Sequence, residues 1–105
     1  MVSNSASMNE KRLMTLMEEA INKPGTGING SYFEEDRTLK IYSLTKHKTI
    51  HIVGNGNGGA DMVLFLHSMF KGDYEETVSF PLNTDEDAKE ILKEVIKEMK
   101  KHRES

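Results

Sequence analysis

Residues 38–53 have the sequence TLKIYSLTKHKTIHIV, in which a polar turn at residues 45–47 separates two alternating runs. β-Branched and aromatic side chains are frequent in both runs, residues 38–44 and 48–53, which is typical of β-strands. A connection this short joins antiparallel neighbours, because a parallel pair needs a crossover of a dozen residues or more. The stretch therefore predicts a β-hairpin in the middle of the chain.

Further runs on either side extend this hairpin into a sheet. Residues 31–34 precede it across a turn at residues 35–37, and residues 74–80 form another strand-like run after a turn at residues 71–73. Each of these turns is short, so the neighbouring strands should again be antiparallel.

The segment at residues 61–70 fits two interpretations. As a helix it would place Met62, Phe65, Leu66 and Met69 on one face. As a strand, its Val, Phe and Leu content suits a buried position in a sheet. We prefer the strand, although periodicity does not distinguish the two in so short an apolar run.

Amphipathic helices are predicted near both ends of the chain. Ser7 and Glu10 have the spacing of a capping box, in which two side chains satisfy N–H groups at a helix start, so a helix should run over residues 8–22. A second helix should begin after a cap at Asn83 or Thr84. The apolar residues of the second helix recur on one face: Ala88, Ile91, Leu92, Val95 and Met99.

These elements predict a single α+β domain over residues 1–105. We expect an antiparallel meander of four or five strands packed with an N-terminal and a C-terminal helix. A chain of 105 residues has no length left for a second core. The ends, residues 1–6 and 102–105, should fray.

Composition limits the class of protein. The chain has no cysteine, which excludes disulfides and thiolate zinc sites and favours the cytosol. Its longest apolar run, residues 62–66, is far shorter than the stretch of about 20 residues that crosses a bilayer, and residues 1–7 lack the pattern of a signal peptide. A formal net charge of -3 argues against a surface that binds nucleic acid generally. We therefore expect a cytoplasmic protein.

Residues 54–59, GNGNGG, form a glycine-rich segment, here called the glycine loop. Gly54, Gly56 and Gly59 have the spacing of a dinucleotide-binding fingerprint, but that fingerprint requires a parallel βαβ unit, whereas the preceding strands are predicted to be antiparallel. Two interpretations remain: a loop that only connects two elements, or a loop whose backbone N–H groups bind an anion. The candidate ligand-binding residues are Lys48, His51, Gly54, Asn55, Gly56, Asn57, Gly58 and Gly59.

Positive charge gathers just before the glycine loop. No Asp or Glu occurs between Asp36 and Asp61, whereas six Arg, Lys or His residues do. This pattern would suit a phosphate-bearing ligand or nucleotide at the glycine loop. It also suggests weak nucleic-acid binding by the hairpin at residues 37–51, or edge-strand lysines that discourage aggregation. The basic residues concerned are Arg37, Lys40, Lys46 and Lys48.

No metal or catalytic site is predicted. His47 and His51 would lie about 13 Å apart on an extended strand, too far for one metal ion. His67 lies in an apolar segment and is interpreted as a structural histidine. The chain lacks the motifs of serine hydrolases, P-loop nucleotide-binding proteins and zinc proteases, so we interpret it as non-catalytic and assign no cofactor.

Exclusion of these classes leads to a functional hypothesis. We expect a small intracellular binding or regulatory protein that acts through a protein partner and can form a homodimer through apolar surface of its sheet or N-terminal helix. The first alternative is a binder of a phosphate-bearing small ligand or nucleotide at the glycine loop. The second is weak nucleic-acid binding by the hairpin at residues 37–51. The composition is also compatible with a bacterial or phage accessory protein.

Overall fold

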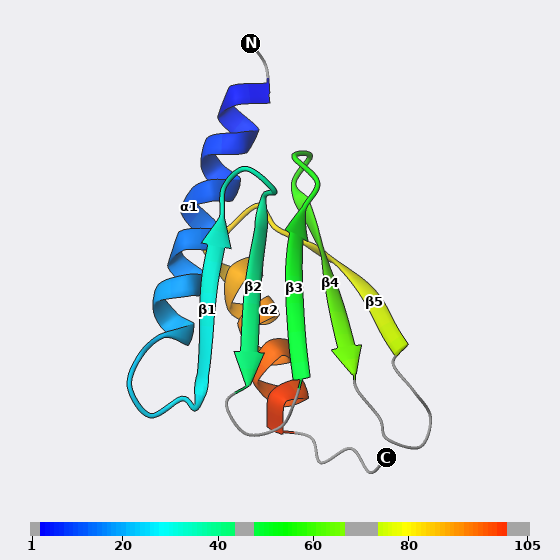
Figure 1. Ribbon diagram of the computed structural model, residues 1–105. Helices are drawn as coiled ribbons and strands as arrows, with labels where there is room; N and C mark the ends of the chain where they lie inside the picture. Colours follow the sequence, from blue (N-terminus) through cyan, green and yellow to red (C-terminus); the bar gives the residue numbers. More distant parts are fainter. Residues whose placement is uncertain (1–2, 44–47, 67–73, 101–105) are drawn as a thin grey trace.

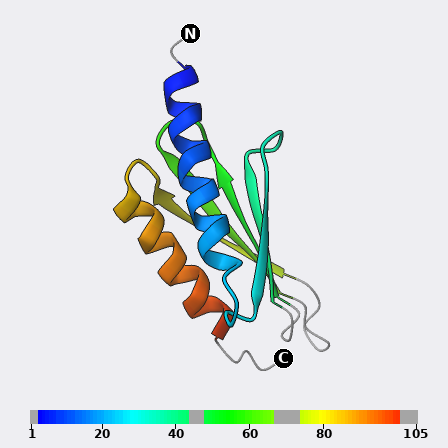
Figure 2. The same ribbon diagram turned by 90° about the vertical axis from the view of Figure 1, so that its left-hand side faces the viewer.

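The computed structural model describes residues 3–43, 48–66 and 74–100 (Figure 1). In chain order the elements are α1 (Ser3–Ile21), β1 (Ile28–Phe33), β2 (Thr38–Ser43), β3 (Lys48–Gly54), β4 (Gly59–Leu66), β5 (Tyr74–Pro81) and α2 (Asp85–Lys100). The strands form one sheet in the order β1-β2-β3-β4-β5, and every neighbouring pair is antiparallel. Both helices lie against the same face of this sheet (Figure 2). The predicted α+β fold with an antiparallel meander is therefore confirmed.

Strand alternation gives the sheet a face that the helices cover and a face that they leave open. On β3, Ile50 and Ile52 are buried, whereas His51 between them is only partly buried. Ile50 lies between Ile41 of β2 and Leu64 of β4, and all three are at most 2% exposed. The core therefore lies between this face of the sheet and the buried helix residues, which include Leu13, Met14, Met17, Ile91 and Val95.

The strand interpretation of the segment at residues 61–70 is confirmed for residues 61–66, where the helical alternative is wrong; residues 67–70 lie outside the described residues. Residues 61–66 belong to β4, which pairs with β3 on one side and β5 on the other. Met62 and Leu64 are buried on the helix-covered face, whereas Val63 and Phe65 are partly buried on the open face. Apolar residues on both faces explain why the sequence of β4 shows no alternation.

Two predicted element boundaries are wrong. α1 begins at Ser3, so Ser7 lies inside the helix and does not cap it. β1 begins at Ile28, three residues before the run predicted at residues 31–34, because the side chains of Asn22 and Thr26 bond to its backbone. The turns expected at residues 45–47 and 71–73 lie outside the described residues.

The start of α2 confirms the predicted cap. The N–H of Asp87 donates to Oγ1 of Thr84 over 3.1 Å, and the Asp87 carboxylate accepts from the N–H groups of Asn83 and Thr84 at 2.8 and 3.1 Å. The predicted apolar stripe is buried except for Leu92, which is only partly buried. Neither helix in the described ranges combines the length and apolarity that a membrane crossing demands.

Candidate functional site

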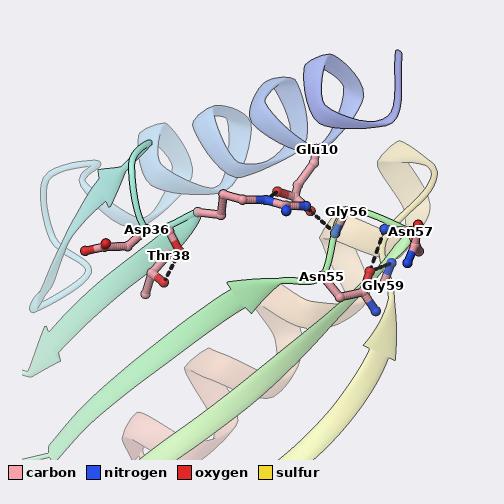
Figure 3. Close-up of polar contacts among 8 residues, drawn as sticks. Glu10, Asp36, Thr38, Asn55, Gly56, Asn57 and Gly59 are labelled. Atoms are coloured by element: carbon pink, nitrogen blue, oxygen red, sulfur yellow. Dashed lines mark hydrogen bonds and ion pairs between the residues drawn. The ribbon is translucent and has the colours of Figure 1, made fainter. Parts of the chain in front are cut away.

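The glycine loop is held by a carboxylate from α1. Figure 3 shows Glu10 pointing from the helix toward Gly56, whose N–H donates to Oε1 of Glu10 over 3.0 Å. The Arg37 guanidinium, from the turn between β1 and β2, donates to the same carboxylate through Nε at 2.9 Å and Nη2 at 3.0 Å. Because the Glu10 side chain is only 6% exposed, this carboxylate is an internal anion with three donors. We call the contact among Glu10, Arg37 and Gly56 the Glu10 clamp.

Close approach explains two of the glycines in the loop. A Cβ added at Gly54 would lie 2.3 Å from the Glu10 carboxylate, and one at Gly56 would lie 2.2 Å from Nη2 of Arg37. Gly56 also has a φ of +79°, a conformation that residues with a Cβ rarely adopt. These glycines are therefore required by the Glu10 clamp itself.

Other N–H groups of the loop donate to acceptors within the chain. The N–H of Gly54 donates to the Arg37 carbonyl over 2.9 Å, and that of Asn55 to the Gly59 carbonyl over 3.0 Å. The Asn55 side-chain oxygen accepts from the N–H groups of Asn57 at 2.7 Å and Gly59 at 3.2 Å. An incoming phosphate would have to displace these acceptors, and it would also meet the charge of Glu10. Binding of an anionic ligand at the loop stays a prediction, and this geometry does not favour it.

The structure does not bring Lys48 or His51 to the glycine loop. Lys48 lies at the opposite end of β3 from Gly54, about 20 Å along the strand. Its side chain is buried, and its Nζ donates to the Glu98 carbonyl in the last turn of α2 over 2.6 Å. A cation there complements the negative end of the helix. His51 points to the open face, where burial and then the nearby charge of Lys40 lower its pKa.

The predicted basic hairpin does not present its charges on one surface. Arg37 bonds to Glu10, and Lys48 is buried beneath α2, whereas Lys40 lies on the open face with its Nζ 4.8 Å from the centre of the Phe33 ring. Lys46 lies outside the described residues. The edge-strand interpretation is wrong for Lys40 and Lys48, because β2 and β3 are interior strands.

A metal site is not indicated by the part of the chain that the structure describes. His47 and His67 lie outside the described residues, so the predicted absence of a shared metal at His47 and His51 is not tested. Within residues 3–43, 48–66 and 74–100, no group of three or more His, Asp or Glu side chains is placed to hold an ion.

The face of the sheet that the helices leave open carries several aromatic and aliphatic side chains. Phe33 and Tyr42 are 42% and 45% exposed, and the rings of His51 and Phe65 meet edge to face with centroids 4.7 Å apart. The side chains that the strand register places on the central part of this face are Phe33, Thr38, Lys40, Tyr42, Thr49, His51, Val53, Asp61, Val63 and Phe65. We use the name open face for this set.

Sequence reasoning did not identify the open face or the Glu10 clamp as sites. The open face does have a signal in the sequence, since Val63 and Phe65 are apolar at the positions that alternate with the core residues Met62 and Leu64. The Glu10 clamp has none, because Glu10 lies far from Arg37 and Gly56 in the chain. No protein-family model, curated protein or solved structure matches the chain.

Proposed function

We propose that the chain is a non-catalytic binding protein whose protein partner docks against the open face of the sheet. The observation that carries the proposal is the set of partly buried and exposed aromatic and aliphatic residues on a face that neither helix covers. An antiparallel sheet with one solvated face normally alternates apolar and polar residues, with the polar side chains toward water. Tyr42, Val53, Val63 and Phe65 depart from that rule on three neighbouring strands.

The side chains of the open face have the chemistry of a protein interface. Aromatic residues contribute large contact areas at the centre of interfaces, and Tyr42 adds a hydroxyl that can bond across one. Lys40 and Asp61 flank β3 from opposite sides and supply charges of both signs at the border of the apolar residues. A mixed arrangement of this kind suits a protein surface better than the uniform positive charge that nucleic acid requires.

The two alternatives have less support from the described residues. A phosphate-bearing ligand at the glycine loop would compete with the acceptors that already bind its N–H groups. Nucleic-acid binding by residues 37–51 would rely on Arg37, Lys40, Lys46 and Lys48. The charged groups of two of them, Arg37 and Lys48, bond within the chain.

Site-specific photo-cross-linking tests the open face directly. A benzophenone amino acid would replace Tyr42 in one variant and Lys93 in a matched control, since the Lys93 side chain is 75% exposed and belongs to α2, a helix that packs on the other face of the sheet. After irradiation of cells of the natural source, we expect a discrete protein adduct from position 42 and none from position 93. Phe65→Ala in the position-42 variant should reduce the amount of adduct about tenfold or more. This corresponds to a loss of at least about 1.4 kcal/mol of binding free energy, as expected for a central interface residue. Equal adducts from positions 42 and 93, or none from position 42, would refute the proposal.

A further inference from the structure

The two edges of the sheet differ in how their backbone groups are satisfied. On β1, Gly30 directs both its N–H and its carbonyl outward, and the Asn22 side chain bonds to each over 2.8 Å. The N–H of Tyr32 donates to Glu18 over 2.8 Å. Oγ1 of Thr26 accepts from the N–H of Ile28 at 3.4 Å, while its proton lies between the Ile21 carbonyl at 2.7 Å and the more distant Ile28 carbonyl at 3.2 Å. Side chains from α1 and the following loop thus close the β1 edge to another strand.

The outer edge of β5 has no such closure among the described residues. The N–H of Leu82 donates to the Gly58 carbonyl, and in an antiparallel pair every second residue bonds to the same neighbour. Phe80 and Val78 therefore direct their N–H and carbonyl groups to β4. The intervening residues, Ser79, Thr77 and Glu75, therefore direct theirs outward. No described side chain or backbone group bonds to these outward groups.

β5 also lacks most features that protect an edge strand. Residues 75–79 are all exposed, Val78 to 48%, and α2 lies behind β2 and β3 in the view of Figure 1, away from the outer side of β5. Proline occurs only at the last residue, Pro81, and the described strand contains no lysine. An eight-residue edge with these properties is a template for a further strand.

We propose that β5 pairs with β5 of a second copy of this chain, antiparallel and about a two-fold axis at Val78. Val78 then lies opposite Val78 of the second copy, and Thr77 lies opposite Ser79. Thr77 and Ser79 exchange both of their outward hydrogen bonds with the second copy, and the Glu75 N–H donates to the Pro81 carbonyl. Because Pro81 has no N–H, the Glu75 carbonyl receives no hydrogen bond from the second copy in this register, and the pairing relies on the two central pairs of Thr77 with Ser79.

Two observations favour a second copy of this chain as the partner strand: the charges across the pairing, and the fact that the other edge of the sheet is capped by side chains. In this register no acidic residue lies opposite another, whereas an axis at Glu76 would place two glutamates side by side. Pairing at β5 also consumes the one edge that the described residues leave open, because side chains close the β1 edge. The assembly therefore ends at two copies and does not grow into a fibre.

The size of this contact predicts its strength. Pairing of two edge strands buries less than the area of about 800 Å² per partner that a standard stable interface buries. We therefore expect a dimer that dissociates on dilution through the micromolar range. The inference does not depend on a partner at the open face, because the two surfaces involve different backbone and side-chain groups.

Single-cysteine variants test the register, since the native chain has no cysteine. In a non-hydrogen-bonded pair at the axis, the Cα atoms lie about 4.5 Å apart, within disulfide range. Val78→Cys should therefore oxidise rapidly to a covalent dimer. Thr77→Cys is the matched control, because residue 77 lies diagonally from its own copy at about 7–8 Å, at the limit of disulfide formation. Equal rates for the two variants, or no dimer from Val78→Cys, would overturn the proposed register.

Sedimentation of proline and alanine variants tests the hydrogen bonds. Thr77→Pro removes one outward N–H without removing a bond to β4, whereas Thr77→Ala keeps it. The wild type and Thr77→Ala should shift from one to two chain masses as concentration rises, and Thr77→Pro should stay at one. Cooperative urea unfolding of Thr77→Pro would show that its fold is intact. A wild type that remains at one chain mass up to about 1 mM, far above the range expected for an edge-strand dimer, would overturn the proposal.

Discussion

Replacement of Glu10 by alanine should destabilise the fold more than any other single change of a charged residue on α1. The substitution removes three hydrogen bonds to a carboxylate, two from Arg37 and one from Gly56. Each hydrogen bond to a charged group contributes about 1.5–3 kcal/mol, but the Arg37 side chain is 39% exposed and regains water once its partner is gone. We therefore expect a loss of about 2–4 kcal/mol in the free energy of unfolding, most of it from the Gly56 N–H and the buried side of the guanidinium.

Urea titration measures this loss with a control on the same helix. At a denaturant slope of about 1–3 kcal/mol per molar, the midpoint for Glu10→Ala should fall by roughly 0.7–4 M. Glu19→Ala removes the same carboxylate from an exposed position of α1 and should shift the midpoint little. Glu10→Gln retains one acceptor and should fall between the two. Equal midpoints for Glu10→Ala and Glu19→Ala would show that the Glu10 clamp contributes nothing to stability.

Three further predictions follow from individual contacts. Gly56→Ala should cost about 1–3 kcal/mol, since its φ is +79° and a Cβ would meet Arg37; an unchanged urea midpoint would contradict the close approach. Ile91→Ala should cost about 2–5 kcal/mol and Lys93→Ala less than about 0.5, and equal effects would remove α2 from the core. Burial first, then Lys40, lowers the pKa of His51 in the folded state, so stability should be complete above the ordinary pKa of 6.5 and decline as the pH falls below it. His51→Gln should reduce that decline, and an identical pH profile would exclude His51 as its cause.

The arrangement of the sheet could be predicted because it depends on local signals. Short polar turns and period-two alternation predicted β2 and β3 to within a residue or two, and the cap and apolar stripe predicted α2. β4 was ambiguous because it is apolar on both faces. Hydrogen bonding to β3 and β5 determines that it is a strand, and the pattern within its own residues does not show that pairing.

The environment of the glycine loop could not be predicted from local spacing. Ser7 and Glu10 match a capping box, yet the Glu10 carboxylate bonds to Arg37 and Gly56, which are 27 and 46 residues away in the chain. Gly54 likewise lacks a side chain because α1 brings a carboxylate to it, and nothing within the loop indicates that neighbour. A glycine-rich motif therefore indicates that some group approaches the backbone closely, but it does not identify that group.

The basic hairpin illustrates the same limit for charge. Its sequence suggests several cations in one place, but Arg37 bonds to Glu10, Lys48 to the end of α2, and Lys40 lies over Phe33. A count of charges along a sequence thus overestimates the charge available to a ligand, because the fold uses some of it internally.

The two proposed interaction surfaces have a geometric relation that affects how strongly a partner would bind. A two-fold axis at Val78, perpendicular to the sheet, would place the open faces of both copies on the same side of one continuous sheet. A partner with two matching sites could then engage both faces at once, and the second contact would be intramolecular. Binding of such a partner should weaken in Thr77→Pro even though every residue of the open face is unchanged, whereas a partner with one site should bind both forms equally. Comparing the two affinities would therefore distinguish a partner that engages both open faces from one that engages a single face.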